Sequence, residues 1–118
     1  MNDALLARFE MRADGALLME FSEIEDNPPF RIRVLIEVSK FRSLTVDRVD
    51  LAGAKTEPLW FISSVEAVRR DGTAIALVGS HQVEFERLVV SSTNGSTISL
   101  HDGSFDVTLT GLSTLTPG

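Results

Sequence analysis

The two histidines are the first residues to consider for chemistry, because histidine is the usual general base and the commonest metal ligand. His81 lies near Glu84 and Glu86, and His101 directly precedes Asp102. No HxH or HExxH spacing brings the histidines together with a carboxylate, and neighbouring side chains on an extended chain point to opposite faces. We therefore expect both histidines at the surface and predict no metal and no cofactor.

The hydroxyl side chains and the glycines form no catalytic motif. The serines and threonines of residues 91–97 gather around a turn, and no G-x-S-x-G elbow surrounds any of them. Gly79, Gly95 and Gly103 stand apart from one another, so no phosphate-binding loop is available. The chain has no cysteine, which excludes disulfides, thiolate zinc sites and cysteine nucleophiles. Together these features favour a protein that is not an enzyme.

Negative charge is concentrated just before the paired prolines Pro28 and Pro29. The spacing of these acids does not match an EF-hand loop, and no glycine is present for the turn that such a loop requires. We predict a solvated strand end whose charge steers a protein partner. The net charge of −6 argues against a nucleic acid or an anionic membrane as the main partner. The acids of this segment are Glu20, Glu23, Glu25 and Asp26.

The bulkiest apolar run is Leu59-Trp60-Phe61-Ile62. Surplus aromatic surface rimmed by polar groups is typical of an interface. We predict an interaction surface at Trp60 and Phe61, with the acids of residues 20–26 nearby. A core position for Trp60, covered on both sides, is the alternative.

These side chains must be held by strands, of which the clearest covers Pro29 to Lys40. Apolar and largely polar residues alternate along it, which is typical of a strand with one face in a core. The apolar positions are Phe30, Ile32, Val34, Ile36 and Val38.

Glycine-containing loops predict three hairpins and their registers. A three-residue loop at 13–15 sets Arg8 opposite Glu20, and similar loops are expected at 70–72 and 93–95. A two-residue turn at Asp102-Gly103 would then complete a three-stranded meander. Its expected apolar face consists of Leu88, Val90, Ile98, Leu100, Phe105, Val107 and Leu109.

The predicted fold is mainly β, a single-domain antiparallel β-sandwich or barrel of about eight to nine short strands. The domain covers residues 1–118, with a loose tail from about residue 111. An α+β fold with helices near residues 3–13 and 58–70 is the alternative.

The function expected from the sequence is a non-enzymatic interaction or structural module that acts through a sheet face or edge. A small acidic inhibitor of a basic partner protein is one form of it. The long regular strand from Phe30 to Val38 also predicts a homodimer. The alternative is a ligand-binding or enzymatic barrel or sandwich with an internal pocket that uses His81, Glu84 and Glu86.

A cytoplasmic location is expected from two features of the sequence. The first residues carry no cationic flank or long apolar run. No segment approaches the roughly 20 apolar residues that a membrane span requires.

Overall fold

The computed structural model describes residues 4–26, 29–47, 60–77, 79, 81–93 and 95–114, with the backbone alone at 24–26, 29–30, 60 and 112–114. These residues form seven strands and no helix, so neither helical alternative is correct. The strands are β1 (Ala4–Met11), β2 (Leu17–Asp26), β3 (Pro29–Ser39), β4 (Ser43–Asp47), β5 (Trp60–Val68), β6 (Val83–Ser92) and β7 (Thr97–Thr114).

The strands form one antiparallel sheet that closes on itself. Their order is β3-β2-β1-β5-β6-β7-β4, and a further pairing of β3 with β7, the neighbour of the end strand β4, closes the sheet. Strand β7 makes this closure possible because it is 18 residues long. Its first half pairs with β6 and β4, and its second half pairs with β3. The mainly β expectation is confirmed, and a closed sheet is one of its two predicted forms.

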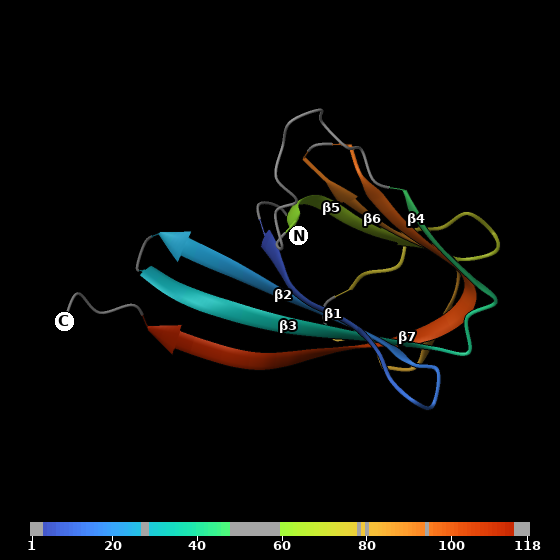
Figure 1. The fold of residues 1–118 in the computed structure, drawn as a ribbon, viewed down its shortest axis with the longest axis horizontal. Helices are drawn as coiled ribbons and strands as arrows, with labels where there is room; N and C mark the ends of the chain where they lie inside the picture. The colour runs from blue at the N-terminus through green and yellow to red at the C-terminus, as the bar shows by residue number, and fades with distance from the viewer. Residues whose placement is uncertain are drawn as a thin grey trace.

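Part of the sheet extends beyond the closed region, and we call this part the arm. It consists of residues 23–26 of β2, 29–34 of β3 and 106–114 of β7. Strand β1 pairs with β2 only as far as Ser22, and β6 pairs with β7 only as far as Phe105, whereas β3 pairs with both neighbours along its length. In Figure 1 the three strands of the arm run out to the left of the other strands.

The closed region is filled by side chains from the inner faces of its strands. The rings of Phe85 and Phe105 lie 5.8 Å apart in a tilted arrangement, which is favourable for aromatic pairs. Ile75, which follows β5 on a loop, is also buried in this cluster. The fully buried large side chains are Phe21, Phe105, Leu17, Met19, Ile36, Ile62, Leu88, Ile98, Leu100, Val38 and Val90.

The three predicted hairpin loops are confirmed. At the first, the Arg12 N–H donates to the Ala16 carbonyl at 2.8 Å and Gly15 adopts a φ of 89°, which sets Arg8 opposite Glu20. The loop at 70–72 leads into a single bridge between Val68 and Ala74, not into a full strand. The loop at 93–95 pairs β6 with β7 in the predicted register.

The predicted turn at Asp102-Gly103 is wrong, because β7 continues through these residues without a chain reversal. Leu100 pairs with Leu44 and Leu88, while Phe105 pairs with Val38 on the neighbouring β3. The apolar pattern does reverse its face here, but a kink in the strand produces the reversal.

The end of β7 also differs from the expectation. Residues 111–114 pair with β3, so a tail does not begin at Gly111, and residues 115–118 lie outside the described chain. Leu109, expected in the core, has 60% of its surface exposed. It lies in the arm, beyond the last residue that pairs with β6.

Candidate functional site

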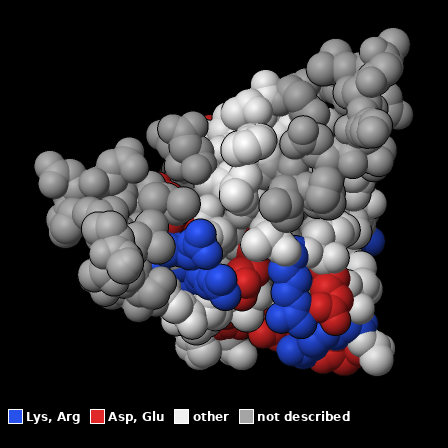
Figure 2. Space-filling model, turned by 60° about the vertical axis from the view of Figure 1, so that its left-hand side comes forward, with Lys and Arg blue, Asp and Glu red and all other residues white. Residues whose placement is uncertain are grey.

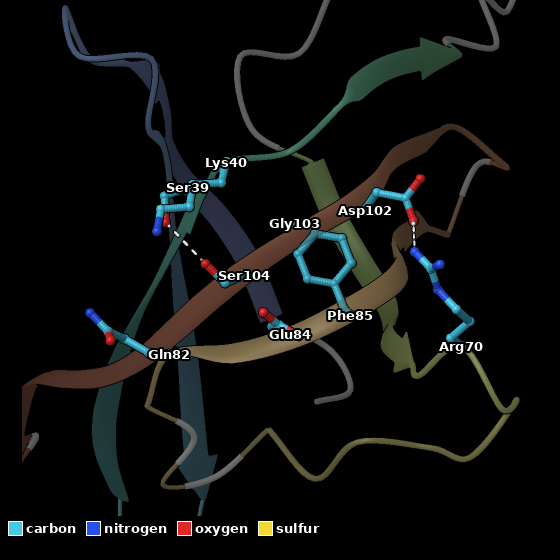
Figure 3. Close-up of a pocket in the computed structure, with 9 residues that line it drawn as sticks. All are labelled: Ser39, Lys40, Arg70, Gln82, Glu84, Phe85, Asp102, Gly103 and Ser104. Carbon is cyan, nitrogen blue, oxygen red and sulfur yellow. Dashed lines mark hydrogen bonds and ion pairs between the residues drawn. The ribbon is translucent and has the colours of Figure 1, made fainter.

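A polar hollow of about 390 Å³ opens beside the kink in β7 (Figure 3). It lies where β3 gives way to β4, and the Phe85 ring occupies its centre in Figure 3 between Lys40 on one side and Arg70 on the other. Its lining residues are Ser39, Lys40, Arg70, Gln82, Glu84, Phe85, Asp102, Gly103 and Ser104.

The backbone around this hollow is unusually constrained. Lys40, Gln82 and Asp102 adopt φ values of 58°, 46° and 53°, and they are the three non-glycine residues with positive φ in the described chain. Such conformations cost of order 1 kcal/mol or more each and tend to gather at functional sites. Gly103 is also required, since a Cβ there would lie 2.9 Å from the Phe41 Cα and from the Ser39 carbonyl oxygen.

Asp102 is the electrostatic centre of the hollow. Its carboxylate forms an ion pair with the Arg42 Nε at 3.0 Å and accepts a hydrogen bond from an Arg70 Nη at 3.5 Å, and so connects the residue before β4 with the loop at 70–72. Both arginines are largely exposed, so each pair contributes at most about 1 kcal/mol. Lys40 and Glu84 form no ion pair with any described residue. The hollow therefore offers both signs of charge to solvent.

The histidines form no catalytic arrangement with the acids beside them. His81 is exposed, and its Nδ1 lies 2.7 Å from an Asp106 oxygen that also accepts the Gln82 N–H at 2.7 Å. The Nδ1 of His101 lies 3.4 Å from the Ser43 hydroxyl, so this ring does not pair with the adjacent Asp102. Within the described residues, no group of three His, Asp or Glu side chains is placed to hold a metal ion.

The predicted interface residues do not form one surface. Phe61 is 54% exposed and pairs with Leu5, while Glu20 pairs with Arg8, so both lie on the outer face of the sheet. By alternation, Glu23 lies on the opposite face, in register with Ile32.

Only the backbone places the remaining predicted residues. Trp60 is the first residue of β5 and pairs with Leu6. Glu25 and Asp26 end β2 in the arm, paired with residues 30 and 29.

The inner face of the arm carries apolar side chains beside Glu23, and no other described strand covers it. Leu109 pairs with Val34, and with Ile32 they lie on the face that continues the core of the closed region. Val34 and Ile32 are half-buried, and Leu109 is exposed. The alternation on which the core prediction rested is the same inside and outside the closed region, so the sequence could not separate the two.

The arm also carries a strand edge unlike the others. The stretch of β7 that pairs with β3 alone begins at Asp106, because β6 pairs with β7 only as far as Phe105. The eight residues after Asp106, Val107 to Thr114, include no charge and no proline. Each other one-sided strand segment in the described chain carries charge: Arg8 and Glu10 on β1, Glu23, Glu25 and Asp26 on β2, Asp47 on β4, Glu66 on β5, and Glu84 and Glu86 on β6.

The sequence analysis did not identify this edge: it places Val107 and Leu109 in a meander strand and a tail from about residue 111. A detectable signal was the absence of charge after Asp106 together with the recurrence of threonine and leucine. Proteins usually protect exposed edges with charge, proline or a bulge. The edge does contain a bulge: Val34 pairs with Leu109 and Arg33 pairs with Gly111, so Thr110 is the extra residue on β7. After Asp106 the edge contains neither charge nor proline.

Charges of opposite sign are interspersed over the surface. Figure 2 shows Lys and Arg beside Asp and Glu along the lower part of the face in view, with uncharged residues above them. A field of one sign, as nucleic-acid binding requires, is not seen on the described part of this face.

Comparisons with protein-family models, curated protein sequences and solved structures gave no significant match. No helix in the described residues is long and apolar enough to cross a membrane.

Proposed function

We propose that this chain is a non-enzymatic protein-binding module that accepts an extended strand at the free edge of β7. The observation that carries the proposal is the uncharged, one-sided segment from Val107 to Thr114. Strand addition at a sheet edge gains affinity from main-chain hydrogen bonds and specificity from alternate side chains.

The side chains along the edge suit such a contact. Val107 and the threonines are β-branched and favour strand conformation. Thr108 and Thr110 are exposed, and Leu109 offers an apolar contact on the face shared with Val34. An added strand would therefore meet hydroxyls on one face and leucine on the other.

The other predictions made from the sequence are also part of this proposal. The acids at Glu20, Glu23, Glu25 and Asp26 steer a partner, and Phe61 provides a second contact. The partner is a protein, not a nucleic acid or a membrane, and the location is cytoplasmic.

The proposal is tested with a fluorescent peptide that copies residues 106–114. Saturable binding to the full chain is expected, with a dissociation constant of roughly 10–100 μM and a corresponding free energy of about −6 kcal/mol. A matched peptide with proline in place of the central threonine should not bind, because it lacks one ladder donor. Amide NMR shifts should change along residues 106–114 of the protein. Absence of binding near 1 mM peptide, or shifts confined to another strand, would overturn the proposal.

A second candidate is the binding of a small polar ligand in the hollow at Asp102. It is favoured by the three left-handed residues gathered there and by the charges of Lys40 and Glu84, which form no ion pair within the described part of the chain. A thermal-shift screen with free amino acids and dicarboxylates tests it, since a ligand at 100 times its dissociation constant stabilises the fold by about 2.7 kcal/mol. A Lys40→Ala variant should lose that stabilisation.

A further inference from the structure

We propose that the strand accepted by the β7 edge is the same edge of a second copy of this chain. The inference rests on the proposed function and names its partner. Two β7 strands would pair antiparallel about a two-fold axis perpendicular to the sheet, making one continuous sheet of order β2-β3-β7-β7-β3-β2.

The charge distribution favours this pairing. Each copy carries a net charge of −6, so two copies repel one another at long range. Among the described strand edges, Val107 to Thr114 bears no charge, so its own side chains add nothing to the repulsion between two copies. The opposite edge of the arm carries Glu23, Glu25 and Asp26, and like charges placed opposite each other destabilise a strand pair.

Self-pairing also uses the side chains of the edge consistently. A two-fold axis perpendicular to the sheet keeps the same face of both arms on the same side. Leu109 of one copy then lies near Leu109 of the other, on the face that also bears Val34 and Ile32. The exposed threonines, Thr108 and Thr110, can form cross-strand hydroxyl pairs, which are among the favourable pairs in sheets.

A copy of the chain explains why this edge carries neither charge nor proline after Asp106. An edge without these devices is an aggregation hazard unless it is covered, and a second copy is present wherever the chain is made. An isologous contact closes after two subunits, so it covers both β7 edges, and the combined sheet then ends at the acidic β2 segments.

The test is the oligomeric state of the full chain, measured by sedimentation velocity over a range of concentrations. A reversible dimer is expected for the unaltered chain. Thr110→Lys should weaken it at least tenfold, because two lysines would lie close together across the axis. Thr45→Lys is the matched control, since Thr45 is also exposed on a one-sided strand, and its effect should stay below twofold.

Hydrogen exchange of the unaltered chain supplies a measurement that does not depend on a variant. Amides within residues 107–114 should gain protection as the concentration rises, whereas β4 amides should not. A dimer that forms equally well with Thr110→Lys, or protection gained elsewhere, would overturn the inference.

The outcomes separate this inference from the proposed function. A chain that stays monomeric near 1 mM but binds the peptide of residues 106–114 accepts strands from another protein, which overturns the inference alone. A monomeric chain that does not bind the peptide overturns both.

Discussion

Leu100 and Phe105 both point into the core although an odd number of positions separates them along β7. On the neighbouring strand β6, Phe85 and Leu88 do the same. On both strands, therefore, the alternation of core-facing and outward-facing side chains is interrupted at the same place in the sheet. On β7 this place lies beside Asp102, which has a φ of 53°. The hollow of Figure 3 lies where this reversal bends the sheet.

Gly103→Ala should destabilise the fold by about 1–3 kcal/mol, because the added Cβ would meet backbone atoms of Phe41 and Ser39 at 2.9 Å. Gly111→Ala is the matched control on the same strand. Its Cβ would lie 3.6 Å from the Arg33 side chain, an ordinary contact, so its effect should be neutral or slightly stabilising. Urea unfolding midpoints of both variants measure the difference. Equal midpoints would show that the close approach at Gly103 relaxes freely.

Leu100→Ala and Leu109→Ala should differ sharply, although both leucines lie on the predicted apolar face of one strand. Leu100 is fully buried, so its truncation should cost about 2–5 kcal/mol. Leu109 is mostly exposed in the arm, and its truncation should cost less than about 1 kcal/mol in dilute solution. Thermal or urea unfolding at low concentration gives both values. A large cost at Leu109 in the monomer would place the arm inside the core.

The hairpin loops and the closure of the sheet show what the sequence could and could not predict. Loops with glycine at the third position fix local registers, and the register at Gly15 is correct along the hairpin. The register at Gly72 is correct only beside the loop, because Val65 pairs with Val90 of β6. The closure of β3 on β7 joins residues distant in sequence, for which no local pattern exists.

The same limits apply to the candidate site. Near Asp102 the apolar residues shift from one set of alternate positions to the other. A tight turn and a kinked strand both produce this pattern; the sequence predicts the turn, and the structure has the kink. The residues from Gly111 onward resemble a loose tail until their partner β3 is known. The exposure of Phe61 agrees with the sequence, but the predicted acids divide between two faces of the sheet.

Asp14 should make part of the stability depend on pH in the acid range. A hydrogen bond from the Arg12 guanidinium, and another from the Ala16 N–H, lower the pKa of Asp14 from its ordinary value of 3.8 to about 2. Because the pKa is depressed in the folded state, this contribution is fully present above pH 4 and is lost as the pH falls through about 2.

The stability of the unaltered chain should therefore exceed that of Asp14→Asn near neutral pH, and the gap should narrow between pH 4 and pH 2. Urea unfolding of both proteins across this range measures the gap, and all other carboxylates cancel in the comparison. A gap that stays constant down to pH 2 would assign the effect of Asp14 to its geometry and not to its charge.

Salt should distinguish the two kinds of contact proposed for this chain. Pairing of two β7 edges brings together copies that each carry a net charge of −6 through a segment without charge. Raising the salt from about 0.05 to 0.5 M shortens the Debye length from roughly 14 to 4 Å and screens the repulsion, so the dimer should strengthen or stay unchanged.

Capture of a basic protein by Glu20, Glu23, Glu25 and Asp26 should show the opposite response, because electrostatic steering raises the association rate and salt removes it. Sedimentation of the chain alone at the two salt concentrations gives the answer, with Thr110→Lys as the reference that lacks the uncharged edge. A dimer that dissociates as salt rises would require an ion-paired interface and would exclude the β7 edge as the contact.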